Sequence, residues 1–324
     1  MSYPQSNKML LAALDEYVSG HTEAKKALIV LLSRSKLRAF QRFGKAMEKE
    51  FLVHPMKVLL IGASGTGKTH LVESLQRISA FPLIKLDATQ LNPTGASGGI
   101  KVKDLKNMIY TEAVRICEEF PLTYPYVEYA IERSVVYVDE VDKLGQNFES
   151  SGNWNRHVQS NYLTMFDNKD EYAGVSYIFS GAFDSITRDS KTVSKSIGFT
   201  DHNKTYKESK ELIDTLVLKS GLIPELVGRL NAIVELDVFG YDELYDILRN
   251  RILPKKKMDL AAHGIFDVYI KKSEVKQIID DCIKSCQGVR YLQRAIDRKF
   301  LDLEFEADSQ EDLLYLPTDY GEEE

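Results

Sequence analysis

The residues best suited to chemistry are residues 62–69, GASGTGKT, which fit G-x-x-x-x-G-K-[ST] between an apolar run and a helical stretch. Glycines let the backbone wrap around phosphates, and the amides at a helix N-terminus supply positive potential. In such a loop Lys68 reaches the β and γ phosphates of a nucleotide, and Thr69 ligates magnesium. We therefore predict that ATP and Mg²⁺ are bound by Gly62, Ser64, Gly65, Thr66, Gly67, Lys68, Thr69 and the adjacent His70.

An acidic pair further along the chain completes this chemistry, in the run VVYVDEVD at residues 135–142. Apolar strand residues deliver Asp139 to the carboxyl edge of a sheet, where it can hold magnesium through water. Glu140 can then polarise the attacking water. Such a pair could instead cap a helix, but its place after a phosphate loop favours ATP hydrolysis. It argues against small-molecule kinases, which must exclude hydrolytic water.

The elements that position these motifs follow from the hydrophobic pattern. Residues 7–17 and 22–43 have helical spacing, with Thr22 as a possible N-cap. Apolar runs then alternate with helical stretches, namely KVLLIG, LIKLDA, SVVYVDEVD and VSYIFSGAF. This alternation predicts an α/β fold whose parallel sheet is flanked by helices. After the stretch LDVFGYDE, helices dominate around one short β element, FDVYI.

We accordingly predict a large α/β domain over residues 1–236, a small mainly helical domain over 237–305, and an acidic tail over 306–324. Residues 301–324 hold ten acidic and no basic residues, so the remainder has 42 basic and 38 acidic residues. That balance is too mild to indicate nucleic-acid binding. No apolar run approaches the ~18–20 residues of a bilayer span, and no signal-peptide layout is present, so we expect a cytoplasmic protein.

The three cysteines are too few for a four-ligand zinc site or a disulfide framework. Cys282 and Cys286 are four apart in a predicted helix, and two small buried hydrophobic residues are favoured over a metal pair. We expect no metal except the ion that accompanies the nucleotide. The aromatic residues of FPLTYPYVEYAI, residues 120–131, could suggest a surface that stacks the bases of single-stranded nucleic acid, but no Lys or Arg accompanies them before Arg133. We therefore interpret this segment as a loop packed over the domain or a contact between subunits.

Several motifs together, in order, resemble the AAA+ protein-unfolding ATPases of the ClpX and HslU group, and ClpX most closely. The resemblance spans roughly residues 14–305. The matching segments are YVSGHTEAKKAL, the phosphate loop, LDATQL, VVYVDEVDKL, FSGAF, SGLIPELVGRL and GVRYLQRAID.

The resemblance assigns roles to four further residues. It implies that Val18, in YVSGH, lies at the adenine and that Ser180, in FSGAF, senses the γ-phosphate. Arg229, in PELVGRL, corresponds to the arginine that reaches the nucleotide of a neighbouring subunit, and Arg290, in GVRYL, to the one that reports ATP to its own subunit. An arginine supplied by a neighbour implies a homo-oligomeric ring, expected to be a hexamer, with sites between subunits.

The chain departs from the family where relatives grip their protein substrates. The Gly-aromatic-Val-Gly loop of the family corresponds here to NPTGASGGIKVKDL, in which Ala96 replaces the aromatic residue. Ile100 or Val102 could grip substrate on a longer loop, or the loop could be a plain glycine loop. The second pore loop is reduced to about DNKDEYAG, and no cysteine-rich zinc module precedes the ATPase in this sequence.

Ile197, Gly198 and Phe199, in SKSIGFTDHNK, match the position of the loop with which ClpX rings dock onto the ClpP peptidase. An exposed isoleucine and phenylalanine among charged residues suit a short anchor motif. Phe199 folding back onto the domain is the alternative.

The sequence therefore predicts a ring-forming, ATP-dependent protein unfoldase that supplies a ClpP-type peptidase. One alternative is a remodeller of a single protein complex without a peptidase, which the altered pore loops suggest. A second is a nucleic-acid-linked motor or loader, and a third is a scaffold subunit that does not hydrolyse ATP. Neither a membrane nor a nucleic acid is an expected partner.

Overall fold

A computed structural model describes residues 6–92, 100–101, 104–145, 152–166, 172–183, 217, 220–266 and 268–308. The chain forms two compact units. One comprises residues 1–63 and 67–237, and the other comprises residues 64–66 and 238–324.

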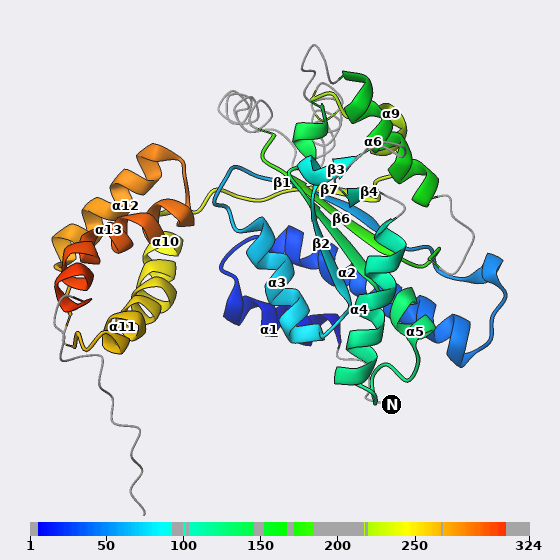
Figure 1. The fold of residues 1–324 in the computed structure, drawn as a ribbon, viewed down its shortest axis with the longest axis horizontal. Helices are drawn as coiled ribbons and strands as arrows, with labels where there is room; N and C mark the ends of the chain where they lie inside the picture. The colour runs from blue at the N-terminus through cyan, green and yellow to red at the C-terminus, as the bar shows by residue number, and fades with distance from the viewer. Residues whose placement is uncertain are drawn as a thin grey trace, which may run out of the picture. The chain divides into compact units, whose positions relative to one another are not determined.

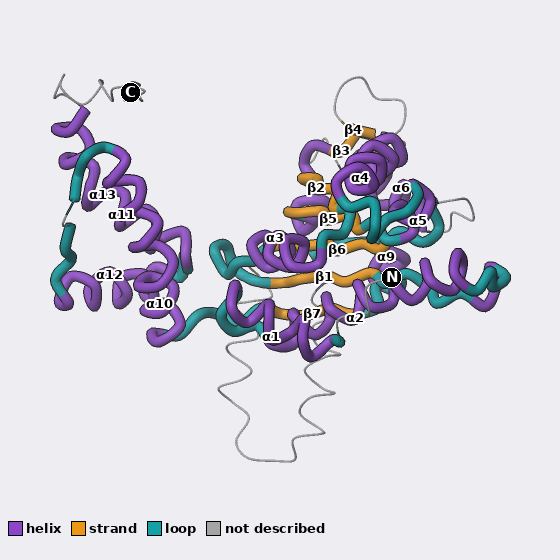
Figure 2. Tube along the Cα trace, turned by 90° about the horizontal axis from the view of Figure 1, so that it is seen from below, coloured by secondary structure: helices purple, strands orange, loops and turns teal. Residues whose placement is uncertain are grey.

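The first unit is built on a parallel sheet, which has five strands within the described residues, in the order β2-β5-β6-β1-β7 (Figures 1 and 2). The strands are β1 Lys57–Ile61, β2 Leu83–Asp87, β5 Val135–Asp139, β6 Ser176–Gly181 and β7 Ala232–Glu235. Two short strands, β3 Leu91–Asn92 and β4 Ile100–Lys101, pair with each other in a separate small sheet. The predicted α/β fold with a parallel sheet is confirmed.

Helices cover both faces of the larger sheet and enclose two apolar cores. On one face lie α1 Asn7–Tyr17, α2 Thr22–Ala39 and α3 Lys68–Ser79. On the other lie α4 Leu105–Glu119, α5 Val127–Glu132, α6 Gly152–Phe166 and α9 Pro224–Val227. The central strands are therefore buried on both sides, which explains their near-continuous apolar sequences.

Strand β7 has no counterpart among the predicted strands. It is only four residues long, and each of its residues is half-buried, because it forms an edge of the sheet. Thr22 is also not an N-cap, since α2 begins at Thr22 itself and His21 precedes it in a left-handed conformation (φ 56°).

The second unit is helical in its described residues after 237 (Figure 1). It contains α10 Tyr241–Ile247, a π-helical turn Leu248–Ile252, α11 Leu253–Ala262, α12 Lys272–Ser285 and α13 Val289–Asp308. Their inward faces form one apolar core that includes Leu248, Leu260, Leu292 and Ile296. None of the described helices of the chain is both long and apolar enough to cross a bilayer.

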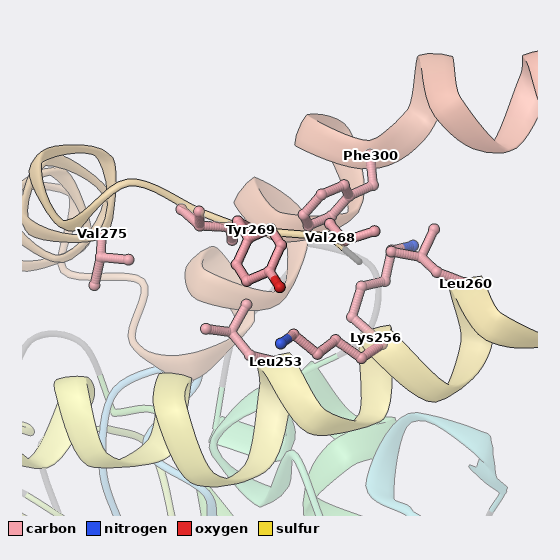
Figure 3. A pocket seen from close by; sticks show the side chains of 9 residues that line it. Leu253, Lys256, Leu260, Val268, Tyr269, Val275 and Phe300 are labelled. Carbon is pink, nitrogen blue, oxygen red and sulfur yellow. The ribbon is translucent and has the colours of Figure 1, made fainter. Parts of the chain in front are cut away.

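The predicted β element FDVYI is wrong, because Phe266 and residues 268–270 carry no strand pairing. Val268 and Tyr269 instead line a cavity of about 190 Å³ together with Leu260 of α11 and Phe300 of α13 (Figure 3). The alternating apolar residues of this segment thus pack against helices and not against a second strand. The residues that line the cavity include none of those predicted to bind nucleotide.

The two cysteines of α12 differ in their surroundings. Cys282 is buried, as predicted, whereas Cys286 is exposed because the helix ends there, with Cys286 in a left-handed conformation (φ 54°). In the described ranges no cluster of three or more histidine, cysteine, aspartate or glutamate side chains could hold a metal ion.

A buried carboxylate ties distant segments of the first unit together. Glu132, at the end of α5, is fully buried and pairs with Arg38 of α2 and with Arg42 of the π-helical turn Phe40–Gly44. Gly174 packs closely against the same carboxyl group, since an added Cβ would lie 2.3 Å from Glu132 Cδ. The stability of this region therefore depends on keeping the Glu132 carboxylate paired with Arg38 and Arg42.

We expect Glu132→Gln to lower the free energy of unfolding by about 3 kcal/mol, because Arg38 would keep its charge in a buried site without its anionic partner. Urea denaturation followed by circular dichroism measures the change. Glu119→Gln is the matched control, since Glu119 pairs with Arg115 on the surface and its loss should cost less than about 1 kcal/mol. Equal losses in the two variants would contradict the prediction.

Candidate nucleotide-binding site

The phosphate loop connects β1 to α3, as its sequence context predicts. Gly65 and Gly67 have φ angles of 83° and 88°, which glycine adopts far more readily than other residues. Lys68, the first residue of α3, donates from Nζ to the carbonyl oxygens of Gly62 at 2.5 Å and Ala63 at 3.2 Å. The ammonium group thus lies along the inside of the loop.

A carboxylate joins the start of α3 to the ends of two strands. Asp139, the last residue of β5, accepts hydrogen bonds from Thr69 Oγ1 at 3.0 Å and from Ser180 Oγ at 2.5 Å. Its two oxygens are engaged separately, Oδ2 by Thr69 and Oδ1 by Ser180. The structure therefore brings together three residues that the sequence analysis assigned to the site from three separate motifs.

Tyr137 belongs to the same cluster, although the sequence analysis did not single it out. Its hydroxyl lies 2.8 Å from Ser180 Oγ and 3.1 Å from Thr69 Oγ1. Tyr137 and Asp139 are two residues apart on β5, so they share a face of the sheet. A tyrosine in an otherwise aliphatic strand, on the face of the functional aspartate, is the signal that could have identified it.

The cluster keeps Asp139 ionised. Burial alone would raise the pKa of this carboxyl, but hydrogen bonds from Ser180, the Glu140 amide and Thr69 outweigh it and hold the pKa below its usual value. Burial raises the pKa of Tyr137 well above its usual value. At neutral pH the cluster therefore contains one carboxylate and three protonated hydroxyl groups.

Glu140 leaves the sheet at a sharp change of backbone direction. Its φ of 58° places a non-glycine residue in the left-handed region, which costs about 1–3 kcal/mol. Its amide donates to Asp139 Oδ1 at 2.9 Å, and its carboxylate pairs with Lys143. The Glu140 side chain is 42% exposed, so water can reach the carboxylate at the end of the strand.

Two other predicted residues lie at the end of α1 and the start of α3. Val18 is buried, and its carbonyl oxygen accepts a hydrogen bond from Lys25 Nζ at 2.5 Å. His70 lies with its Nε2 3.1 Å from the carbonyl oxygen of Tyr17, the residue before Val18. The segment predicted to contact adenine therefore adjoins the helix that follows the phosphate loop.

Arg290 and Ser64 both belong to the second compact unit. Within it, Arg290 Nη1 donates to Ser64 Oγ at 2.9 Å, and the Val289 amide donates to the Gly65 carbonyl oxygen at 3.1 Å. Gly65 has no room for a side chain there, because an added Cβ would lie 2.1 Å from the Gln287 carbonyl oxygen.

Arg229 follows α9 and is half-buried. Ile197, Gly198 and Phe199, predicted to dock onto a peptidase, lie outside the described residues, as do Ala96 and Val102 of the predicted pore loop. The acidic residues 309–324 are likewise outside the described part of the chain. The predictions for these segments stay predictions.

Comparison with known proteins gives the class of this one. Residues 58–188 match the family described as "ATPase family associated with various cellular activities (AAA)". With the phosphate loop and the parallel sheet, this match shows an AAA ATPase domain over residues 58–188. The chain is also similar to the "ATP-dependent Clp protease ATP-binding subunit ClpX" of Treponema denticola. The two are 26% identical in an alignment that covers 91% of this chain and 76% of the relative. The chain therefore contains an AAA ATPase domain and is similar to ClpX, as its motifs predicted.

We expect Glu140→Gln to bind ATP with unchanged affinity and to lose at least about 100-fold in kcat, because an amide cannot accept the proton of the attacking water. A fluorescent ATP analogue measures binding, and phosphate release measures hydrolysis. Glu73→Gln is the matched control, since Glu73 is also a half-exposed glutamate paired with a lysine, Lys85, and should leave kcat unchanged. Substantial turnover by Glu140→Gln would refute the assignment of Glu140.

Proposed function

We propose that this AAA+ ATPase uses magnesium-dependent ATP hydrolysis to unfold or remodel proteins, works as a ring of subunits, and delivers substrates to a ClpP-type peptidase. The hydrogen-bonded cluster of Thr69, Asp139 and Ser180 next to the phosphate loop carries the hydrolytic part. The similarity to ClpX along nine tenths of the chain supports the choice of protein substrates.

The residues of the cluster fit a magnesium ion. Thr69 Oγ1 and Asp139 Oδ2 lie 3.0 Å apart, and hydroxyl and carboxylate oxygens are ligands that this hard cation prefers. Magnesium commonly takes only one or two protein groups and completes its shell with phosphates and water. When bound, the ion would neutralise phosphate charge.

The remaining steps are assigned to side chains of this chain. Lys68 would hold the β and γ phosphates, and Glu140 would take the proton of the attacking water. Ser180 would sense the γ-phosphate, as the family resemblance implies. Arg290 would report bound ATP to its own subunit, as the family resemblance implies.

Arg229 would complete the site of a neighbouring subunit, where its guanidinium would stabilise charge that develops on the phosphate. Sites shared between subunits require an oligomer, and the family precedent is a closed ring of six subunits. Closure of the ring would let nucleotide-dependent changes in each subunit act on one substrate.

We expect Arg229→Ala and Glu140→Gln each to lose ATPase activity alone and to regain part of it when the two variants are mixed. Mixed rings would contain interfaces with an intact Glu140 from one subunit and an intact Arg229 from the next. Phosphate release against mixing ratio measures the effect. Arg249→Ala mixed with Glu140→Gln controls for subunit exchange alone. If the mixture stays inactive although the subunits exchange, Arg229 does not act in a neighbouring site.

We expect the purified protein to lower the fluorescence of a tagged fluorescent protein only with hydrolysable ATP, and a ClpP-type peptidase to make the loss irreversible. Replacement of Ile197 and Phe199 by alanine should abolish the peptidase effect and spare ATP hydrolysis, because the apolar anchors would be gone. Hydrolysis with persistent fluorescence across several tags would contradict general unfolding and would favour a remodeller of one complex, consistent with Ala96 in the pore loop.

A further inference from the structure

The buried hydroxyl of Tyr137 has no role among the steps of hydrolysis assigned above. It lies between Thr69 and Ser180, both of which hydrogen-bond to Asp139. Only 1% of Tyr137 is exposed, and its ring packs in the apolar core between the sheet and helices α1 to α3. The hydroxyl group is therefore the only polar part of a side chain that is otherwise core.

A count of protons shows what this hydroxyl does. Thr69 and Ser180 each have one hydroxyl proton, and both protons are used in hydrogen bonds to Asp139. Neither hydroxyl can then donate to Tyr137, so the phenolic proton must be donated toward their oxygens. The shorter contact, 2.8 Å against 3.1 Å, is the one to Ser180 Oγ. The single phenolic proton is thus directed mainly to Ser180 Oγ, with Thr69 Oγ1 as the more distant acceptor.

The donor limits how these hydroxyl groups can rotate. A hydroxyl oxygen has two lone pairs. When Thr69 donates to Asp139 and faces Tyr137 with one lone pair, the other is available for a metal ion. Without the Tyr137 hydroxyl, Thr69 and Ser180 would be held only by their hydrogen bonds to Asp139, so their rotamers would be less restricted.

We propose that Tyr137 is a positioning residue for ATP hydrolysis, which holds the hydroxyl groups of Thr69 and Ser180 in the orientations that serve magnesium and the γ-phosphate. The inference rests on the proposed function of these two residues. Tyr137 would then link Thr69, assigned to magnesium, to Ser180, assigned to the γ-phosphate, through one phenolic group.

Tyr137→Phe tests this role because phenylalanine fills the same place in the core and lacks only the hydroxyl group. The magnesium concentration that gives half-maximal binding of a fluorescent ADP analogue should rise about fivefold or more, and kcat should fall by a similar factor, as expected for loss of one buried hydrogen bond. The thermal midpoint should change by no more than about 3 °C. A purely structural role would lower the thermal midpoint and leave the magnesium dependence unchanged.

Tyr162→Phe is the matched control. Tyr162, in α6, is also fully buried, and its hydroxyl has no hydrogen-bond partner among the described residues. Its loss should leave the magnesium midpoint and kcat unchanged. A Tyr137→Phe variant that behaves like Tyr162→Phe would overturn the proposal.

A double-mutant cycle tests the coupling. Ser180→Ala should reduce kcat. Tyr137→Phe should then lower kcat by a smaller factor in the Ser180→Ala background than in the wild-type protein, because one acceptor of the phenolic proton is already gone. Independent, multiplicative effects would overturn the coupling through Ser180.

Glu140→Gln separates a failure of the proposed site from a failure of the role of Tyr137. If it keeps hydrolysing ATP, the proposed site itself fails; if it does not and Tyr137→Phe leaves the magnesium midpoint unchanged, only the role of Tyr137 fails.

Discussion

The first unit depends on Asp139, a half-buried carboxylate that remains ionised. Asp139 carries its charge at the end of a strand that is covered on both faces, and an isolated charge there would be unfavourable. Hydroxyl groups from α3 and β6 and the amide of Glu140 offset that cost. The start of α3, the acidic motif and the strand that contains Ser180 are therefore fixed relative to each other by the need to solvate a single charge.

The same arrangement explains why the backbone bends at Glu140. If β5 continued, the Glu140 side chain would point to the opposite face of the sheet from Asp139. The left-handed conformation ends the strand instead, directs the Glu140 amide to Asp139, and leaves the carboxylate near solvent. Strain of this kind persists only where the surroundings hold it in place, as the Asp139 hydrogen bonds do here.

Much of the fold was predictable because both faces of β1, β5 and β6 are buried, and this burial requires apolar runs that stand out in the sequence. Strand β7 was not predictable in this way, since an edge strand of four half-buried residues needs no such run. The strand order was also beyond the sequence, because it depends on contacts between distant segments. FDVYI alternates like a strand although its apolar residues pack against helices, so the two-residue period alone was misleading.

At the site, parallel strands gave a reason to expect Asp139 and Ser180 at the same edge of the sheet, and the structure places them there with Thr69. The position of Tyr137 was encoded in its spacing from Asp139, but a buried tyrosine in a strand is ordinarily part of a core. The pairing of Glu140 with Lys143 depends on the bend after β5, which no local pattern indicated. The roles proposed for Arg229, Arg290 and Val18 rest on the family resemblance.

The two-residue spacing of Tyr137 and Asp139 has a consequence for how this protein can evolve. Insertion or deletion of one residue in β5 before Tyr137 would move both side chains to the opposite face of the sheet, away from Thr69 and Ser180, and one between them would separate the two onto different faces. Compensation would require a matching change in β6 and a new first turn of α3, all at once. We therefore expect changes in chain length outside β5, and changes within β5 to be substitutions.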